Sequence, residues 1–236
     1  MKISILTMFP EMFSGFLHSP VPSHAIAKRA VEVEIVDIRS YAEGSYRHID
    51  DSPYGGGAGM ILRCEPVIKA LEDVKTPGCH TILMAAAGFP YTQMKAHEYA
   101  SLEHLVILCG HYEGVDARIL NDTDECISCG DYIVTGGEYP SMIIADSVIR
   151  LLDGVIRHES IEEESYENGL LEYPQYTRPA VFNGEKVPDV LLSGNHEAVR
   201  RWRLQESLRT TLKYRPDLLE NRILSPEEAK LLEKIK

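Results

Sequence analysis

The sequence predicts an α/β fold built on a parallel sheet and followed by a small helical C-terminal domain. Over the first two thirds of the chain, short apolar segments alternate with amphipathic ones, an order typical of a sheet covered by helices. The apolar segments are nearly continuous in Ile, Leu and Val, as in parallel strands buried on both faces. Glycine-rich loops follow two of these segments, at the sheet edge where α/β folds bind their ligands.

The length of each apolar segment, and the spacing of the apolar residues within it, predict whether it forms a strand or a helix. The short apolar segments are expected as strands, at Lys2–Met8, Val33–Ile38, Thr81–Ala86, Leu105–Cys109 and Glu125–Ser128. The segments with apolar residues at helical spacing are expected as helices, at Glu65–Val74, Gln93–Ala100 and Ser141–Leu152.

The composition changes in residues 157–172, where glutamates are frequent and apolar residues are few, so we expect a flexible acidic linker. Beyond it, Asn195 is a suitable N-cap for a helix that reaches Tyr214. Ser225-Pro226-Glu227-Glu228 is a capping box that begins a last helix through Leu232. The chain therefore divides into an α/β domain at 1–156, the linker at 157–172 and a helical domain at 173–236.

The overall charge and the cysteines exclude several classes of protein. A formal charge of −12 argues against a protein that coats nucleic acid by bulk electrostatics, so any RNA site must be a local basic patch. Cys126 and Cys129 form a lone CxxC pair, which does not complete a tetrahedral zinc site, and we expect no metal site. No apolar segment approaches the ~20 residues of a membrane span, and the N-terminus is not typical of a signal peptide. We expect a cytoplasmic protein without a membrane partner.

Two glycine-rich loops follow predicted strands and are candidates for a ligand site. Gly110–Gly114 follows one strand and Gly130–Glu138 follows another, whereas no strand is followed by a GxGxxG motif. Glycine allows the backbone to approach a flat ligand without a Cβ in the way. Each loop by itself is also consistent with a tight turn, but two loops with polar and aromatic neighbours favour a pocket for an adenine-like group.

Several long strings of residues, in order, carry a resemblance to a known family. They are Phe9-Pro10-Glu11-Met12-Phe13, Asp50-Asp51-Ser52-Pro53-Tyr54-Gly55-Gly56-Gly57-Ala58-Gly59-Met60, Tyr112-Glu113-Gly114-Val115-Asp116, Gly130-Asp131-Tyr132 with Thr135-Gly136-Gly137-Glu138, Tyr176-Thr177-Arg178-Pro179, and Val190-Leu191-Leu192-Ser193-Gly194-Asn195-His196. With these strings, the chain resembles the bacterial tRNA (guanine-N1)-methyltransferase family of the SPOUT class along nearly its whole length.

The resemblance implies a fold, a reaction and partners. It implies a deep trefoil knot where the Gly110 and Gly130 loops thread past each other, which is an exception among folds. It also implies methyl transfer from S-adenosylmethionine to N1 of guanosine 37 (G37) in tRNA, by a homodimer whose active site is completed across the interface. A magnesium requirement is implied as well, without a dedicated protein site in this sequence.

Carried over residue by residue, the resemblance implies a cofactor site at the two loops and at one residue before them. Its members are Ala86, Gly110, Tyr112, Glu113, Cys129, Gly130, Asp131, Tyr132, Ile133, Val134, Gly136 and Gly137. The sequence departs from the usual family pattern at several positions near this site. It has Ala85-Ala86-Ala87-Gly88 in place of Ser-Pro-Gln-Gly, His111 and Ser52 in place of arginines, and Ala58 in place of a proline.

The resemblance implies two catalytic residues, Glu164 and Arg150. Guanine N1 must lose its proton before it attacks, and the family uses an aspartate before a serine as the base, where this chain has Glu164-Ser165. Glu163 is the alternative base, because this segment is one residue shorter than usual. Arg150 matches the arginine that stabilises charge on guanine O6, although the residue by itself is also consistent with an ordinary solvent-facing helix arginine.

The RNA-binding residues fall into two groups. The resemblance implies Asp50, Gly59, Ser165 and Glu172, and the basic residues of the predicted 195–214 helix add Arg209 and Lys213. Trp202 lies among them and is either a base-stacking residue or part of the core. Two other functions are weighed against this one: a non-catalytic RNA-binding relative, and a SPOUT methyltransferase that acts on another RNA base.

Overall fold

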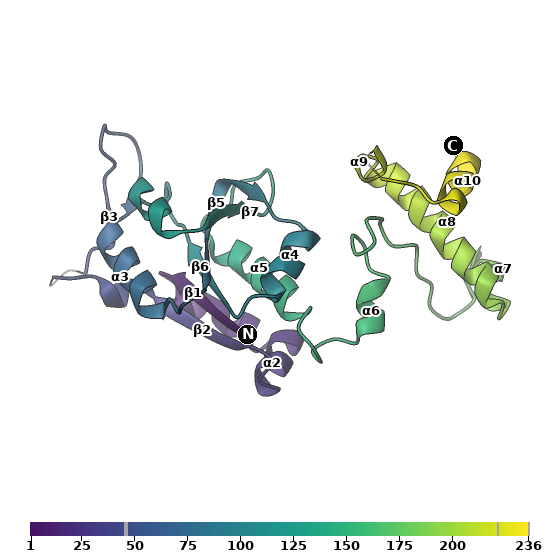
Figure 1. Cartoon of the computed structure of the whole chain (residues 1–236), viewed down its shortest axis with the longest axis horizontal. Coiled ribbons are helices and arrows are strands. Elements are labelled where there is room, and N and C mark those ends of the chain that lie inside the picture. The colour runs from purple at the N-terminus through teal and green to yellow at the C-terminus, as the bar shows by residue number, and fades with distance from the viewer. Residues whose placement is uncertain (45–46, 221, 236) are drawn as a thin grey trace. The chain divides into compact units, whose positions relative to one another are not determined.

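The computed structural model describes residues 1–44, 47–220 and 222–235. The chain divides into two compact units, Met1–Ile156 and Arg157–Lys236 (Figure 1). Among the described residues, no helix is both long and apolar enough to cross a membrane.

The first unit is built on a five-stranded sheet with the order β2-β1-β6-β5-β7. All neighbouring strands are parallel, which confirms the predicted sheet. The strands are β1 (Lys2–Thr7), β2 (Glu32–Asp37), β5 (His80–Pro90), β6 (His104–Cys109) and β7 (Glu125–Ser128).

Strand β5 continues to Pro90, four residues beyond the expected end at Ala86. Its register against β7 shifts between Met84 and Phe89. Gly88 lies so close to β7 that a Cβ would be 2.5 Å from the backbone of Ile127. The small residues that precede Phe89 thus allow β5 to follow β7 closely, a feature that the apolar pattern alone does not reveal.

Helices cover both faces of this sheet (Figure 1). One core cluster joins Ile3 and Ile5 of β1 to α2 (Pro20–Ala27), α4 (Gln93–Ala100) and α5 (Glu138–Ile149). A second cluster joins the other face to α3 (Cys64–Val74) and η3 (Ala117–Asp122), and its members include Leu6, Leu71 and Ile119. This two-sided burial explains why the strands are nearly continuous in apolar residues.

Helix α5 begins at Glu138, three residues before the expected start at Ser141, and ends at Ile149. The remaining elements of this unit are η1 (Pro10–Phe13), α1 (Ser14–Leu17), η2 (Ile38–Tyr41), β3 (Asp50–Asp51), β4 (Ile61–Leu62), α3 (Cys64–Val74) and η3 (Ala117–Asp122).

The second unit contains a long helix, α8 (His196–Tyr214), and a shorter one, α10 (Pro226–Ile235). Leu208 of α8 and Leu231 of α10 are buried together with Leu170. The smaller elements are α6 (His158–Glu162), β8 (Val181–Phe182), β9 (Glu185–Lys186), α7 (Asp189–Leu192) and α9 (Asp217–Glu220).

Both predicted helix caps in this unit are confirmed. The side chain of Asn195 accepts a hydrogen bond from the Ala198 amide at 3.1 Å. Ser225 and Glu228 form the reciprocal capping box, with amide-to-side-chain distances of 2.7 and 3.2 Å. These contacts satisfy amide groups that the first turn of each helix leaves without an intrahelical partner.

Residues 157–172, which the sequence suggested as a linker, belong to the second unit in the structure. They contain α6, and Leu170 is buried in the core of the unit with 2% of its surface exposed. The Leu171 amide donates to Oγ1 of Thr211 on α8 at 2.9 Å, and the Tyr166 amide donates to the Leu170 carbonyl at 2.7 Å. A single buried leucine and local hydrogen bonds thus attach a segment whose composition is mostly polar.

Candidate functional site

The two glycine loops meet at the carboxyl ends of β6 and β7. The amide of Gly137 donates a hydrogen bond to the carbonyl of Gly110 at 2.6 Å, and His111 forms a β-bridge with Gly136. A Cβ on Gly137 would lie 2.8 Å from Cα of Cys109, which is closer than real Cβ atoms approach. Glycine is therefore required at position 137 for the loops to make this contact.

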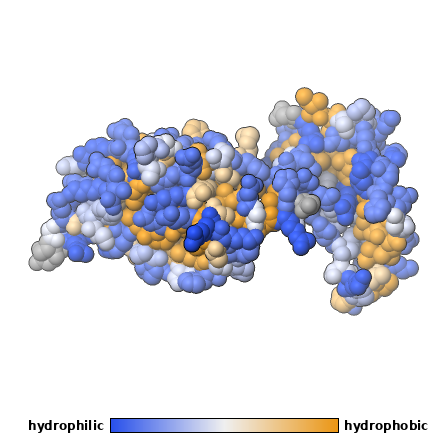
Figure 2. Space-filling view, turned by 60° about the horizontal axis from the view of Figure 1, so that its bottom comes forward, coloured by the Kyte–Doolittle hydropathy of each residue, from blue (hydrophilic) through white to orange (hydrophobic). Residues whose placement is uncertain are grey.

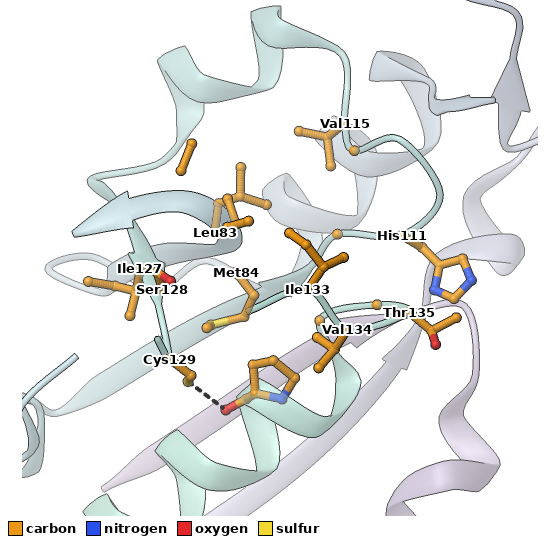
Figure 3. Close-up of a pocket in the computed structure, with 18 of the residues that line it drawn as sticks. Leu83, Met84, His111, Val115, Ile127, Ser128, Cys129, Ile133, Val134 and Thr135 are labelled. Carbon is orange, nitrogen blue, oxygen red and sulfur yellow. Dashed lines mark hydrogen bonds between the residues drawn. The ribbon is translucent and has the colours of Figure 1, made fainter. Parts of the chain in front are cut away.

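A cavity of about 410 Å³ opens beside this contact. All the residues predicted to bind the cofactor line it except Asp131. Figure 3 shows its wall, where Leu83 and Met84 from β5 and Ile127 from β7 lie beside Ile133 and Val134 of the second loop. The cavity has the size and the mostly apolar wall of a small-molecule site.

Sequence reasoning missed several residues of this cavity. They are Leu83, Met84, Ala85, Ala87, His111, Gly114, Val115, Ile127, Ser128, Thr135 and Pro140. Most adjoin the predicted residues along the chain, so proximity to the loops was the signal that could have found them. His111 was noted only as a departure from the family pattern.

The thiols at this site are neutral at physiological pH. Burial raises the pKa of Cys129, and its Sγ donates to the Pro140 carbonyl at 3.8 Å, drawn as a dashed line in Figure 3. Burial also raises the pKa of Cys109, whose Sγ lies 3.1 Å from Oγ of Ser141. Both residues therefore act as apolar packing groups rather than as nucleophiles.

A third segment reaches the rim of the cavity. The Glu113 amide donates to the carbonyl of Met60 at 3.1 Å, and a Cβ on Gly59 would overlap the Glu113 carboxylate. The structure thus brings Gly59, predicted to bind RNA, next to a predicted cofactor residue. Asp50 lies farther along the same segment in β3, and its side chain is partly exposed.

Arg150 does not line the cavity of its own chain. It is the C-cap of α5, whose N-terminus adjoins the cavity. The 12 residues of α5 separate the two ends by roughly 18 Å at 1.5 Å per residue. Within one chain, the predicted arginine and the predicted cofactor residues therefore lie apart.

Glu164 lies in the second unit, beside a cavity of about 330 Å³. Its neighbour Ser165 accepts a hydrogen bond from the Glu172 amide at 2.9 Å, so these two predicted RNA-binding residues are brought together. The other side chains around this cavity come from the segment that follows Glu164 and from α8: Asn168, Leu170, Leu171, Tyr173, His196, Val199, Arg200, Arg203, Leu204 and Ser207, with Glu163 before them.

Glu163 has strong partners within the second unit. Its carboxylate accepts a hydrogen bond from the Tyr173 hydroxyl and two from Nη1 of Arg203, at 2.9 and 3.2 Å. The Arg203 guanidinium also lies 4.7 Å from the centre of the Tyr173 ring. Burial, and then the hydrogen bond to Glu163, raises the pKa of Tyr173 to about 12. Glu163 is thus the centre of a contact between α8 and the segment after α6.

The predicted basic helix is partly neutralised by its own acidic neighbours. Arg209 pairs with Glu206, while Lys213 is exposed with Nζ 4.6 Å from the Tyr214 ring centre. Other arginines of the region also pair with carboxylates: Arg200 with Glu197 and Glu227, and Arg215 with Asp217. Trp202 is only partly buried, and its ring lies 6.3 Å from that of Tyr176.

The described residues contain no group of three or more His, Cys, Asp or Glu side chains suited to hold a metal ion. Cys126 and Cys129 are free thiols.

Comparison with known proteins gives one consistent result. Residues 1–221 match the family model described as tRNA (Guanine-1)-methyltransferase TrmD. A tRNA (guanine-N(1)-)-methyltransferase of Halalkalibacterium halodurans is 53% identical, covering 100% of this chain and 98% of the relative. Proteins of the same name from Bacillus cereus and Bacillus anthracis are 52% identical, covering 100% of this chain and 99% of theirs. With its whole length matched in this way and the glycine loops joined around a cavity, the chain belongs to the tRNA (guanine-1)-methyltransferase family.

Proposed function

We propose that this protein transfers a methyl group from S-adenosylmethionine to N1 of guanosine 37 in tRNA. The names of the relatives support the tRNA substrate and the guanine N1 position. The observation that carries the proposal is the cavity of about 410 Å³ between the Gly110 and Gly130 loops, lined by nearly all the residues that the resemblance implies for the cofactor.

The loops fit the proposed cofactor in shape and in chemistry. The close contact between Gly110 and Gly137, which leaves no room for a Cβ, holds the two loops together beside the cavity. Leu83, Met84 and Ile127 supply an apolar wall for its adenine ring. When bound, S-adenosylmethionine supplies an electrophilic methyl group, and this chain must orient it and prepare guanine N1 to accept it.

We propose Glu164 as the base that removes the N1 proton. Between the two candidates, Glu163 is held by Tyr173 and Arg203, so its carboxylate is committed to a structural contact. Glu164 adjoins Ser165 as the family base does, and a carboxylate there accepts the proton while Arg150 stabilises the charge that develops on O6.

The proposed active site requires two copies of the chain. Arg150 is roughly 18 Å from the N-terminus of α5 along the helix axis, so the cavity of one chain does not include it. We propose a homodimer in which the cofactor loops of one protomer meet the Glu164 segment of its partner. A symmetric interface of this kind uses the same surface of both copies.

Exposed apolar side chains support the dimer. Figure 2 shows orange apolar areas among blue hydrophilic ones on the surface. On α5, Tyr139 and Ile143 are 60% and 49% exposed and lie four residues apart, on one face of the helix. Phe89 and Met94 are 70% and 78% exposed. Large exposed apolar groups of this kind are typical of protein interfaces.

The remaining assignments complete the proposal. We propose a trefoil knot at the two glycine loops, which the hydrogen bond from Gly137 to Gly110 brings together. We assign the methyl donor to residues 1–156 and tRNA binding chiefly to residues 173–236, joined by residues 157–172. Asp50, Gly59, Ser165, Glu172, Arg209 and Lys213 would contact the RNA, and with tRNA as its substrate the protein would act in the cytoplasm. We also propose a magnesium requirement for catalysis, without a dedicated protein site.

One assay tests this function. The purified protein is incubated with radiolabelled S-adenosylmethionine and tRNA transcripts that carry either G37 or A37. We expect labelling of the G37 transcript alone, with the product identified as 1-methylguanosine by nuclease digestion and mass spectrometry. Equal labelling of both transcripts would indicate another target base, and binding of tRNA without any labelling would indicate a non-catalytic relative.

A further inference from the structure

A buried carboxylate lies directly behind the loops of the proposed cofactor cavity. Glu138, the first residue of α5, is 2% exposed. One of its carboxylate oxygens accepts a hydrogen bond from Oγ1 of Thr7 at 2.9 Å. The N-terminus of α5 provides a favourable dipole. A carboxylate buried this deeply still requires a nearby cation or further donors, because burial of an uncompensated charge is costly.

His111 is placed to supply that cation. Its Nδ1 lies 3.6 Å from Oε2 of Glu138 and is buried, with no hydrogen-bond partner among the described residues. The ring is held between Phe9, at a centroid distance of 4.9 Å, and Tyr112, which it meets edge-on at 4.8 Å. The protonated ring can therefore pair with Glu138, whereas the neutral ring leaves the carboxylate without a cationic partner.

The pair stands beside the contact that closes the cavity. His111 follows Gly110, and Glu138 follows Gly137, the two residues joined by the 2.6 Å hydrogen bond between the loops. A Cβ on Gly136 would overlap both Nδ1 of His111 and the Glu138 carboxylate. Both side chains therefore pack directly against the backbone of Gly136, which lines the cavity.

Other charged or titratable groups around the pair come from three elements. Arg39 has its guanidinium 5.9 Å from the centre of the Phe9 ring, which packs against His111. Cys109 is buried at the end of β6, and this burial, followed by the charge of Glu138, raises its pKa. Tyr112 lies on the loop of His111 itself. Of these side-chain types, histidine is the one whose charge ordinarily changes between about pH 5 and 8.

We propose that His111 is a positioning residue for the cofactor: in its protonated form it pairs with Glu138 and holds the two glycine loops in the arrangement that binds S-adenosylmethionine. This inference rests on the proposed function of the cavity. Loss of the proton from an imidazole removes the cation from a pair of this kind, so the proposal predicts that cofactor affinity falls as the pH rises.

Isothermal titration of S-adenosylhomocysteine into the full-length protein at pH 6, 7 and 8 tests the inference. The proteins compared are the wild type, His111→Arg, His111→Gln and His80→Gln. Because the titratable groups of the ligand are the same in all four experiments, the difference between the pH profiles is the informative quantity. His80 is the matched control, since it pairs with Glu125 at 2.8 Å at the opposite end of β5.

We expect wild-type and His80→Gln affinities to fall by about fivefold more between pH 6 and 8 than that of His111→Arg, whose cation persists. His111→Gln should bind as weakly at pH 6 as the wild type does at pH 8. Thermal denaturation of each variant confirms that it is folded at each pH. A wild-type profile parallel to that of either His111 variant would overturn the inference, whereas absence of ligand binding at every pH would overturn the proposed function of the cavity itself.

Discussion

Nη1 of Arg203 lies 2.9 Å from Oε2 of Glu163. This contact, together with the hydrogen bond from the Tyr173 hydroxyl, gives Glu163 a structural role between α8 and the segment after α6. Two adjacent glutamates of the same chemistry are thereby separated into a structural residue and a proposed base. The distinction depends on contacts between residues 40 positions apart in the chain.

The first prediction follows from that distinction. Glu164→Gln removes the proposed base but keeps the size of the side chain, so single-turnover methylation should fall by about 10²-fold or more. Glu163→Gln should retain methylation within a few-fold and should instead lower the melting temperature, because the Arg203 contact loses its charge. Rate against pH, measured with saturating cofactor, checks both. Wild-type rates for both variants would mean that neither glutamate is the base.

Arg150 carries the second prediction. Arg150→Ala should reduce single-turnover methylation by about 10²-fold, as loss of one group that stabilises developing negative charge does in other enzymes. Affinity for S-adenosylhomocysteine should change little, because Arg150 does not line the cofactor cavity of its own chain. A large loss of cofactor affinity with an unchanged rate at saturation would contradict the assignment.

Gly137 supplies the third prediction. A Cβ at this position would lie 2.8 Å from Cα of Cys109 and 2.9 Å from the Gly110 amide nitrogen, both rigid backbone atoms. Gly137→Ala should therefore separate the two loops and abolish detectable binding of S-adenosylhomocysteine. Gly15→Ala is the control, since a Cβ there meets nothing within 4 Å. Equal binding by the two variants would show that the loop contact is not needed for the cofactor.

Much of this fold could be predicted from the sequence. Strands such as Leu105–Cys109 are buried on both faces, and burial on both faces requires the nearly continuous run of apolar residues that the sequence shows. The helix caps at Asn195 and Ser225 could also be predicted, since capping depends on residues within one turn of the chain. The β5 extension to Pro90 was not, because it depends on how closely Gly88 can approach β7.

The candidate site could be predicted only where glycine spacing or family resemblance marked it. The glycines of both loops were identified, but the pairing of His111 with Glu138 was not, because it joins two loops far apart in the sequence. In the same way, the pairing of Arg209 with Glu206 changes the meaning of a basic helix, and a count of arginines does not show it.

The fourth prediction concerns tRNA binding by α8. Lys213 is exposed and has no carboxylate partner among the described residues, whereas the charge of Arg209 is offset by Glu206. Lys213→Ala should therefore lower the slope of log affinity against log salt by about 0.7–0.9, the amount expected for one phosphate contact. Arg209→Ala should lower it less. Filter binding of tRNA at several salt concentrations makes the comparison, and identical slopes for Lys213→Ala and the wild type would remove Lys213 from the interface.

The last prediction tests the dimer through α5. Tyr139 and Ile143 are exposed in the single chain, at 60% and 49%, and lie on one face of the helix. If a second copy covers this face, a carboxylate at position 143 becomes buried without a partner, which is costly. Ile143→Glu should therefore shift sedimentation at micromolar concentration from about twice 26.5 kDa toward 26.5 kDa.

Methylation should fall with the loss of the dimer, because the proposed site takes its cofactor loops and Glu164 from different protomers. Ile223→Glu is the matched control, since Ile223 is 97% exposed and belongs to the second unit rather than to α5. That variant should remain dimeric and active. An Ile143→Glu monomer with full activity would contradict the shared site, and because each chain would then be sufficient, Arg150 and Glu164 would have to act on the cofactor loops of their own chain.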